Sequence, residues 1–228
     1  MRISGLQKLT LLDYPGKLAC TLFAPGCNFR CPFCHNASLV AGPADCLDGA
    51  ALRDFLRRRR GVLQGVCLTG GEPLLQPDAV DFLLELRAMG YATKLDTNGA
   101  FPEALRRAVE AGAVDYVAMD VKNAPSAYGE TVGRPGLDLG PIRESVAYLL
   151  TAPVDYEFRT TVVRELHDEA RLLELAGWIR GAERYFLQAF RDSGDLLAPG
   201  LTGYDEAELR RLAAAVATVL PGVQLREV

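Results

Sequence analysis

The 228-residue sequence predicts an α/β fold, specifically a partial (β/α)6 TIM-like barrel with parallel strands. Strand-like and helix-like segments alternate along the chain, and each pair of parallel strands needs such a crossover. Right-handed crossovers curl this repeat into a barrel or a doubly wound sheet. A complete eightfold barrel typically needs about 250 residues, so six principal strands fit this length better. We expect one domain that spans residues 1–228.

Each expected element follows from its local pattern. The strands are short apolar runs at 17–24, 66–69, 91–97, 116–122, 156–163 and 184–189, and the run at 156–163 is rich in β-branched residues. The helices lie between or after them, at 48–60, 77–90, 102–111, 141–150, 168–180 and 205–219. A last short run at 223–226 is expected to form an edge strand.

Composition and charge exclude several classes of protein. The net charge is −4, whereas a nucleic-acid binder usually carries a basic surface. No stretch reaches the roughly 18 apolar residues of a membrane span. The first residues lead into no apolar segment of a signal peptide, so we expect a cytoplasmic protein with neither nucleic-acid nor membrane partners.

Three cysteines form the most informative motif of the chain. Cys27, Cys31 and Cys34 follow the first expected strand with the spacing C-x3-C-x2-C. The carboxyl ends of barrel strands are where active sites are built. Thiolates are soft donors that suit iron and zinc. Three of them from one loop would leave one iron of a [4Fe–4S] cluster without a protein thiolate, and therefore open to a ligand.

A closed zinc site is the alternative, because structural zinc needs a fourth ligand. His35 is adjacent to the third cysteine and is strained for that purpose. Cys20 and Cys67 lie within apolar strands, where cysteine behaves as a small core residue. Cys46 lies in a polar loop without an evident role.

With these residues in place, the sequence resembles the radical S-adenosylmethionine superfamily. Phe33 and the sequence Gly-Gly-Glu-Pro at 70–73 belong to the same pattern as the cysteines. Three further segments resemble the glycyl radical enzyme activating enzymes: Cys-His-Asn at 34–36, Asp-Thr-Asn-Gly at 96–99 and Met-Asp-Val-Lys at 119–122. The segments 11–17 and 187–191 resemble activating proteins of the anaerobic ribonucleoside-triphosphate reductase.

The resemblance implies a complete reaction. A [4Fe–4S] cluster would reductively cleave S-adenosylmethionine, and a hydrogen atom would be taken from a glycine of a partner protein. The expected partner is the anaerobic ribonucleotide reductase, with a flavodoxin or ferredoxin as electron donor. The chemistry belongs to cluster and cofactor, so no catalytic residue is expected beyond their ligands.

The resemblance also assigns the cofactor contacts. Gly70 and Gly71 let backbone approach the amino group of the cofactor, and Glu72 acts as an acceptor or as a loop brace. Asp120 suits ribose hydroxyls and Lys122 suits the methionyl carboxylate. A buried ion pair between these last two residues is the alternative.

The remaining contacts come from the later strands and the cysteine loop. Arg159 is a charge among β-branched residues and should point into a polar barrel lumen. Gln188 and Phe190 are expected to read and cover adenine, although Phe190 could equally be a core aromatic. Phe33 and His35 are expected beside the cofactor, and His35 could instead bond to backbone.

A monovalent cation is implied by the resemblance to the pyruvate formate-lyase activator. Its ligands would be Asp96, Thr97, Met119 and Asp120, of which Asp96 and Thr97 also count among the cofactor contacts. Oxygen donors suit such a hard cation. His167 is given no catalytic role.

Two other functions remain open from the sequence. One is a radical enzyme that acts on a small molecule such as a deazapurine. The other is a non-enzymatic iron–sulfur or zinc protein.

Overall fold

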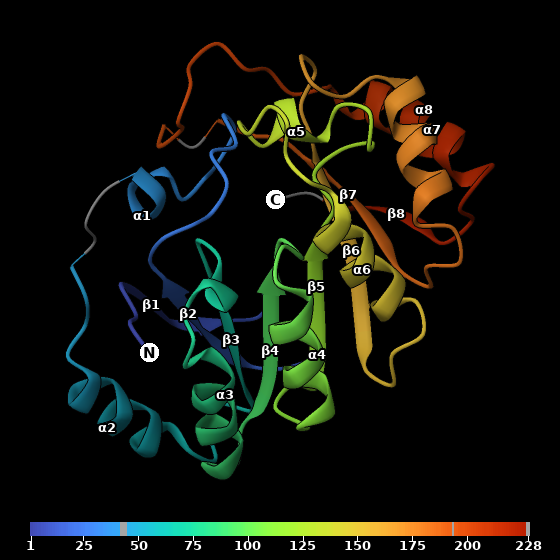
Figure 1. Cartoon of the computed structure of the whole chain (residues 1–228). Coiled ribbons are helices and arrows are strands. Elements are labelled where there is room, and N and C mark those ends of the chain that lie inside the picture. Colours follow the sequence, from blue (N-terminus) through green and yellow to red (C-terminus); the bar gives the residue numbers. More distant parts are fainter. Residues whose placement is uncertain (42–44, 193, 227–228) are drawn as a thin grey trace.

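The computed structural model describes residues 1–41, 45–192 and 194–226. In these residues one curved eight-stranded sheet follows the order of the chain (Figure 1). Its strands are β1 (Gly5–Thr10), β2 (Ala19–Ala24), β3 (Gly65–Gly70), β4 (Ala92–Thr97), β5 (Tyr116–Asp120), β6 (Asp155–Val162), β7 (Tyr185–Ala189) and β8 (Val223–Arg226). β1 runs antiparallel to β2, and all later neighbours are parallel. β1 and β8 are the two edges, so the barrel is open.

Helices connect the parallel strands, and α3, α4 and α6 lie on the outer side of the sheet (Figure 1). The helical segments are α1 (Ala37–Ala41), α2 (Gly49–Arg59), the 3-10 turn η1 (Pro73–Leu75), α3 (Ala79–Ala88), α4 (Pro102–Glu110), α5 (Tyr128–Thr131), α6 (Gly140–Leu149), α7 (Glu169–Trp178) and α8 (Glu206–Ala217). Three of them begin at an aspartate whose side chain accepts from a backbone N–H of the first turn: Asp48, Asp168 and Asp205.

The predicted fold class is confirmed, with a correction to the number of strands. The six principal strands appear as β2 to β7, and the expected edge strand appears as β8. β1 was not predicted, because its central residues are exposed and its apolar residues do not alternate. The short segments α1, η1 and α5 were also not predicted. No helix in the described part of the chain could span a membrane.

Strand alternation separates an apolar outer layer from a polar lumen, the inner face of the curved sheet. On β6, Tyr156 and Phe158 pack in the core with the helices. Their neighbour Arg159 points the other way and lines an internal cavity. Parallel register then sets Asp120 of β5 beside Arg159. The lumen therefore collects charged residues at the carboxyl ends of the strands.

Candidate active site

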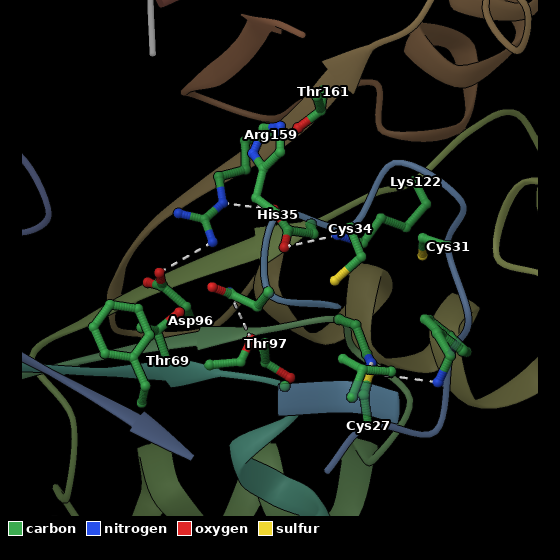
Figure 2. A pocket seen from close by; sticks show the side chains of 18 of the residues that line it. Cys27, Cys31, Cys34, His35, Thr69, Asp96, Thr97, Lys122, Arg159 and Thr161 are labelled. Carbon is green, nitrogen blue, oxygen red and sulfur yellow. Dashed lines mark hydrogen bonds and ion pairs between the residues drawn. The ribbon is translucent and has the colours of Figure 1, made fainter. Parts of the chain in front are cut away.

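A cavity of about 320 Å³ lies at the carboxyl ends of the parallel strands, which is a size typical of small-molecule sites. It is lined by most of the residues selected from the sequence: Cys27, Cys31, Phe33, Cys34, His35, Gly70, Gly71, Asp96, Thr97, Asp120, Lys122, Arg159 and Gln188. Figure 2 shows the three cysteines on one side of this cavity and Asp96 and Arg159 on the other. Glu72, Met119 and Phe190 are not among the lining residues.

The loop after β2 carries the three cysteines. Cys31 is buried, while Cys27 and Cys34 are half-buried. The sulfur of Cys27 accepts a hydrogen bond from the backbone N–H of Phe29 at 3.4 Å. Burial raises the pKa of the Cys31 thiol to about 12, so an iron that binds there displaces a proton.

This donor set fits a [4Fe–4S] cluster. Three soft ligands from one loop face one cavity, and N–H donors to sulfur are a usual feature of iron–sulfur sites. Among the described residues, no three His, Cys, Asp or Glu side chains are arranged to hold a single metal ion.

The Gly-Gly turn after β3 packs directly against the cysteine loop. A Cβ on Gly71 would lie 1.9 Å from the carbonyl oxygen of Gly26. Gly70 has φ +117°, and a Cβ there would lie 2.4 Å from the backbone of Ala24. The N–H of Glu72 donates to Gly26 at 2.8 Å. The two glycines therefore let the cysteine loop approach the turn, in addition to leaving backbone exposed in the cavity.

Glu72 makes the contacts of a loop brace. Its buried carboxylate accepts from the backbone N–H of Asn98 at 2.6 Å and of Leu74 at 3.0 Å. It also accepts from the hydroxyl of Thr97 at 2.9 Å. Burial raises its pKa to about 7, although these donors pull in the opposite direction. The side chain thus ties the turn after β3 to the turn after β4.

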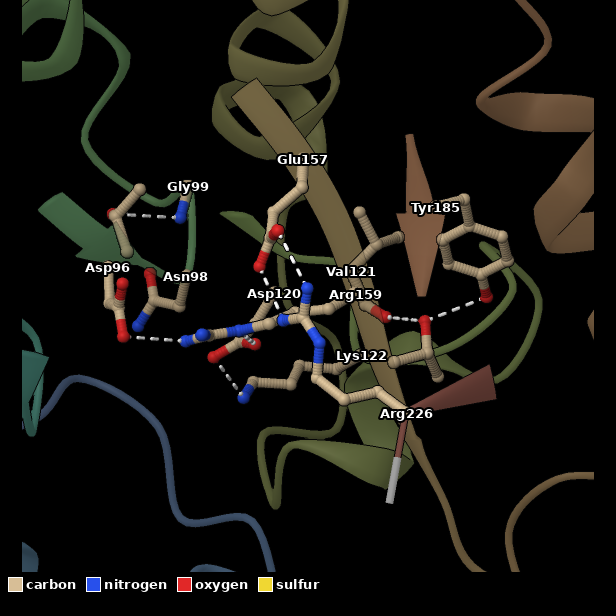
Figure 3. A network of polar contacts seen from close by, with 12 residues as sticks. Asp96, Asn98, Gly99, Asp120, Val121, Lys122, Glu157, Arg159, Tyr185 and Arg226 are labelled. Atoms are coloured by element: carbon tan, nitrogen blue, oxygen red, sulfur yellow. Dashed lines mark hydrogen bonds and ion pairs between the residues drawn. The ribbon is translucent and has the colours of Figure 1, made fainter. Parts of the chain in front are cut away.

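The charged residues of the lumen are paired with one another (Figure 3). Arg159 donates to Asp120 at 2.5 Å and to Asp96 at 3.1 Å, and Lys122 pairs with Asp120 at 3.0 Å. The ion pair that the sequence left as an alternative for Asp120 and Lys122 is therefore present. Burial alone would raise the pKa of Asp120, but Arg159 and Lys122 hold it well below its usual range. Both carboxylates remain ionised at neutral pH.

The aromatic residues near the cavity divide into two groups. Phe33 lines the cavity and meets the ring of His167 edge to face at 6.3 Å. His35 lies parallel to Phe190 at 5.7 Å, and its Nε2 is 2.8 Å from the carbonyl of Arg191. The hydrogen bond of His35 to the backbone, which was the alternative interpretation of this residue, is thus present.

The sequence predicted that Gln188 and Phe190 share a wall of the cavity, but only Gln188 lines it. Gln188 lies on β7 and lines the cavity. Phe190 is buried outside it, because β7 ends at Ala189 and the alternation of the strand no longer applies one residue later.

His167 supports the wall behind the cavity. Its Nδ1 accepts from the N–H of Val163 at 3.1 Å, so the Nε2 proton points to the carbonyl of Lys122 at 2.8 Å. Burial lowers the pKa of His167, which keeps the imidazole neutral.

Three of the four candidate ligands of a monovalent cation, Asp96, Thr97 and Asp120, line the cavity. The side chain of Met119 is fully buried and points to the other face of β5, so this residue could offer a hard cation only its backbone carbonyl oxygen. Its methyl group lies where a Cβ of Gly99 would be.

Two asparagines join the loops of the site, and sequence reasoning gave neither a role. Asn36 donates to the carbonyl of Gly70 at 3.1 Å. Asn98 donates to the side chain of Asn28 at 2.8 Å, beside Cys27. Both belong to the motifs at 34–36 and 96–99, which was the available signal. Lys94, Asp13 and Thr21 were missed as well, although Asp13 and Thr21 line the cavity.

An open parallel barrel with a three-cysteine loop and a Gly-Gly turn around one cavity defines a barrel enzyme with an iron–sulfur centre at the carboxyl ends of its strands. The Radical SAM superfamily matches residues 21–176, and the chain belongs to this superfamily. Its members use a [4Fe–4S] cluster together with S-adenosylmethionine.

Comparisons with individual proteins agree with this family. A Methanocaldococcus jannaschii protein, provisionally named a glycyl-radical enzyme activating enzyme, is 29% identical over 99% of the chain and 96% of its own length. The pyruvate formate-lyase-activating enzyme of Clostridium pasteurianum is 32% identical over 54% of the chain, which spans about half (52%) of that enzyme. A radical SAM methyltransferase structure from Sphaerobacter thermophilus has a TM-score of 0.74 over 96% of this chain and 68% of its own. At 18% identity this structure supports the fold alone.

Proposed function

We propose that this chain is a glycyl radical enzyme activating enzyme. The observation that carries the proposal is the single cavity shared by the three cysteines, the Gly-Gly turn and the charged end of the lumen. The relative from Methanocaldococcus jannaschii, which aligns along nearly the whole chain, supports the same activity.

Cys27, Cys31 and Cys34 are the proposed ligands of the cluster. When bound, cluster and S-adenosylmethionine supply the reductive cleavage that leads to hydrogen abstraction from the partner's glycine. The chain holds the thiolates in one loop, which the Gly-Gly turn and the brace of Glu72 keep in position.

The polar residues of the cavity are the proposed cofactor contacts. Lys122 lines the cavity, and its ammonium donates one hydrogen bond to Asp120. An ammonium has three N–H donors, so it also suits the methionyl carboxylate. Asp120 and Asp96 offer acceptors for hydroxyl or amino groups, and Arg159 holds both carboxylates in place. Gln188 offers an amide for the base.

The remaining predicted contacts belong to the same wall: Phe33, His35, Gly70, Gly71 and Thr97. Phe190 acts through His35, against which it stacks, rather than by contact with the base.

The proposed partner is the anaerobic ribonucleotide reductase, with a flavodoxin or ferredoxin as electron donor. The support is the resemblance of segments 11–17 and 187–191. The first segment includes Asp13, which lines the cavity, and the second includes Gln188. Both segments therefore reach the cavity in which the proposed cofactor would lie.

The test is electron paramagnetic resonance on reduced, reconstituted protein mixed with S-adenosylmethionine and the reductase. We expect the doublet of a glycyl radical. Cys31→Ala removes one ligand from the cluster, so we expect 5′-deoxyadenosine production to fall to background while the far-UV circular dichroism stays that of the wild type. Cys46→Ala is the matched control, because Cys46 is exposed and lies outside the cavity.

Two results would contradict the proposal. Cofactor cleavage without any glycyl doublet, together with tight binding of a small metabolite, would favour a small-molecule substrate. Zinc without iron in the isolated and reconstituted protein would remove the radical chemistry altogether.

A further inference from the structure

Five charged side chains on the inner face of the sheet form a chain of alternating charge, which begins at Lys94 on β4. The ammonium of Lys94 pairs with one oxygen of Asp96, and Arg159 donates to the other at 3.1 Å. Arg159 also donates to Asp120 at 2.5 Å, and Lys122 pairs with the second oxygen of Asp120 at 3.0 Å. Three cationic groups thus face two carboxylates, and Figure 3 shows the part around Arg159.

Lys94 is buried in a way that lysines rarely are, with only 2% of its surface exposed. It precedes Asp96 by two residues on the same strand, so it lies on the same face but deeper in the lumen. Its ammonium is 3.8 Å from the sulfur of Cys67 and 6.0 Å from the ring centre of Tyr116. A buried ammonium is costly without a carboxylate, and Asp96 supplies one. Lys94 is therefore a fixed positive charge on Asp96.

The monovalent cation expected from the family resemblance does not fit this arrangement. Each of the four carboxylate oxygens of Asp96 and Asp120 already accepts from a cationic side chain. The hydroxyl oxygen of Thr97 accepts from the N–H of Gly99 at 3.2 Å, while its proton goes to the buried carboxylate of Glu72. A further cation would have to approach three cationic groups that already pair with these two carboxylates, and like charges repel strongly where water is scarce.

We propose that Lys94 is a positioning residue that takes the place of a monovalent cation beside Asp96. Its ammonium and the guanidinium of Arg159 hold the carboxylate of Asp96 at the cavity wall. Binding of S-adenosylmethionine by this chain then needs no added Na⁺ or K⁺. The inference rests on the proposed function for the identity of the cofactor. Lys94 itself does not line the cavity and acts through Asp96.

The first measurement is the dissociation constant of S-adenosylmethionine for the reconstituted holoenzyme, by equilibrium dialysis in equal concentrations of sodium, potassium or tetramethylammonium chloride. The wild type should bind equally, within about twofold, in all three salts. Lys94→Met removes one of the two positive charges beside Asp96, so this variant should bind S-adenosylmethionine about tenfold more weakly in tetramethylammonium. Na⁺ or K⁺ should restore much of this loss, because a small cation can enter the space that the lysine leaves. Lys94→Arg keeps the charge and should stay insensitive to the salt.

The second measurement needs no cofactor: the thermal unfolding midpoint in the same three salts. The midpoint of Lys94→Met should rise in Na⁺ or K⁺ relative to tetramethylammonium, whereas the wild type should not respond. Lys94→Gln replaces the methionine variant if that one does not fold. The matched control is Lys8→Met, an exposed lysine on β1 outside the cavity, and it should behave as the wild type.

Two outcomes overturn the role of Lys94. One is a wild type that binds the cofactor about tenfold more tightly in Na⁺ or K⁺ than in tetramethylammonium. The other is a charge-removing variant whose unfolding midpoint ignores the cation. A wild type that binds no S-adenosylmethionine in any salt would instead refute the proposed function, and the unfolding midpoints would still decide the role of Lys94.

Discussion

At the scale of single residues, the carboxylate of Glu72 ties the turn after β3 to the turn after β4. It is fully buried, and burial raises its pKa from 4.5 to about 7. The protonated form is therefore the one that folding favours. The stability that this form contributes is complete below about pH 4.5 and is lost as the pH rises through about 7.

Glu72→Gln tests this linkage, because glutamine does not titrate. The wild type should lose ~3 kcal/mol of unfolding free energy relative to the variant from about pH 4.5 to pH 8. Urea denaturation at several pH values measures it. Glu103→Gln, at an exposed position of α4, is the control and should show no such trend. A constant difference between wild type and Glu72→Gln across this range would contradict the assignment.

Residue types were predicted more reliably than residue contacts. The cysteines and the Gly-Gly-Glu sequence could be recognised because their identity and spacing are set by chemistry. The hydrogen-bonding partner of each polar side chain could not be predicted, because the pairing depends on the register of strands far apart in the chain. Lys94 is the clearest case: the sequence displays a lysine in a strand, and only the fold places its ammonium on Asp96.

At the scale of elements, the short helix α5 packs against the cysteine loop. Tyr128 on α5 is fully buried between Phe29 of that loop, at 6.4 Å, and Trp178 of α7, at 5.9 Å. The N–H of Arg30 donates to the carbonyl of Val132, just after α5, at 2.8 Å. This short element therefore holds the cysteine loop in position.

Tyr128→Ala should cost ~3–5 kcal/mol of stability, as large-to-small changes at buried aromatic positions do. It should also lower the iron content after reconstitution, because the cysteine loop loses its support. Urea denaturation and iron analysis measure the two effects. Tyr185→Ala is the matched control, since Tyr185 is equally buried on β7 but contacts Thr160 instead of the loop. Equal iron contents in the two variants would contradict the role of α5.

The elements that escaped prediction have a common physical cause. α1 and α5 are five and four residues long, too short for a helical period to appear in the sequence. β1 buries little of its surface, so it needs no alternating pattern. The long elements were predicted within a few residues, because each must bury one apolar face.

At the scale of the whole molecule, the alternation of strands and helices was sufficient to predict the order of the sheet. Each crossover returns the chain to the neighbouring position, and the strands consequently pair in sequence order. The alternation does not reveal which side chains meet inside the lumen of the open barrel. Some of these contacts are ion pairs between strands that are not neighbours, such as the pair of Arg226 on the edge strand β8 with Glu157 on β6.

Arg226→Met tests how this edge contributes to the barrel. Arg226 donates two hydrogen bonds, at 2.7 and 2.9 Å, to the carboxylate of Glu157, which is buried and otherwise accepts from Tyr116 at 2.8 Å. Without the guanidinium a buried charge lacks its counter-ion, and we expect a loss of ~3–5 kcal/mol by urea denaturation. The double variant Glu157→Gln/Arg226→Met should recover most of that loss. Arg58→Met, which breaks a solvent-exposed pair with Asp54 on α2, should cost less than about 1 kcal/mol. A double variant no more stable than Arg226→Met would show that the arginine stabilises the protein by its packing and not by its charge.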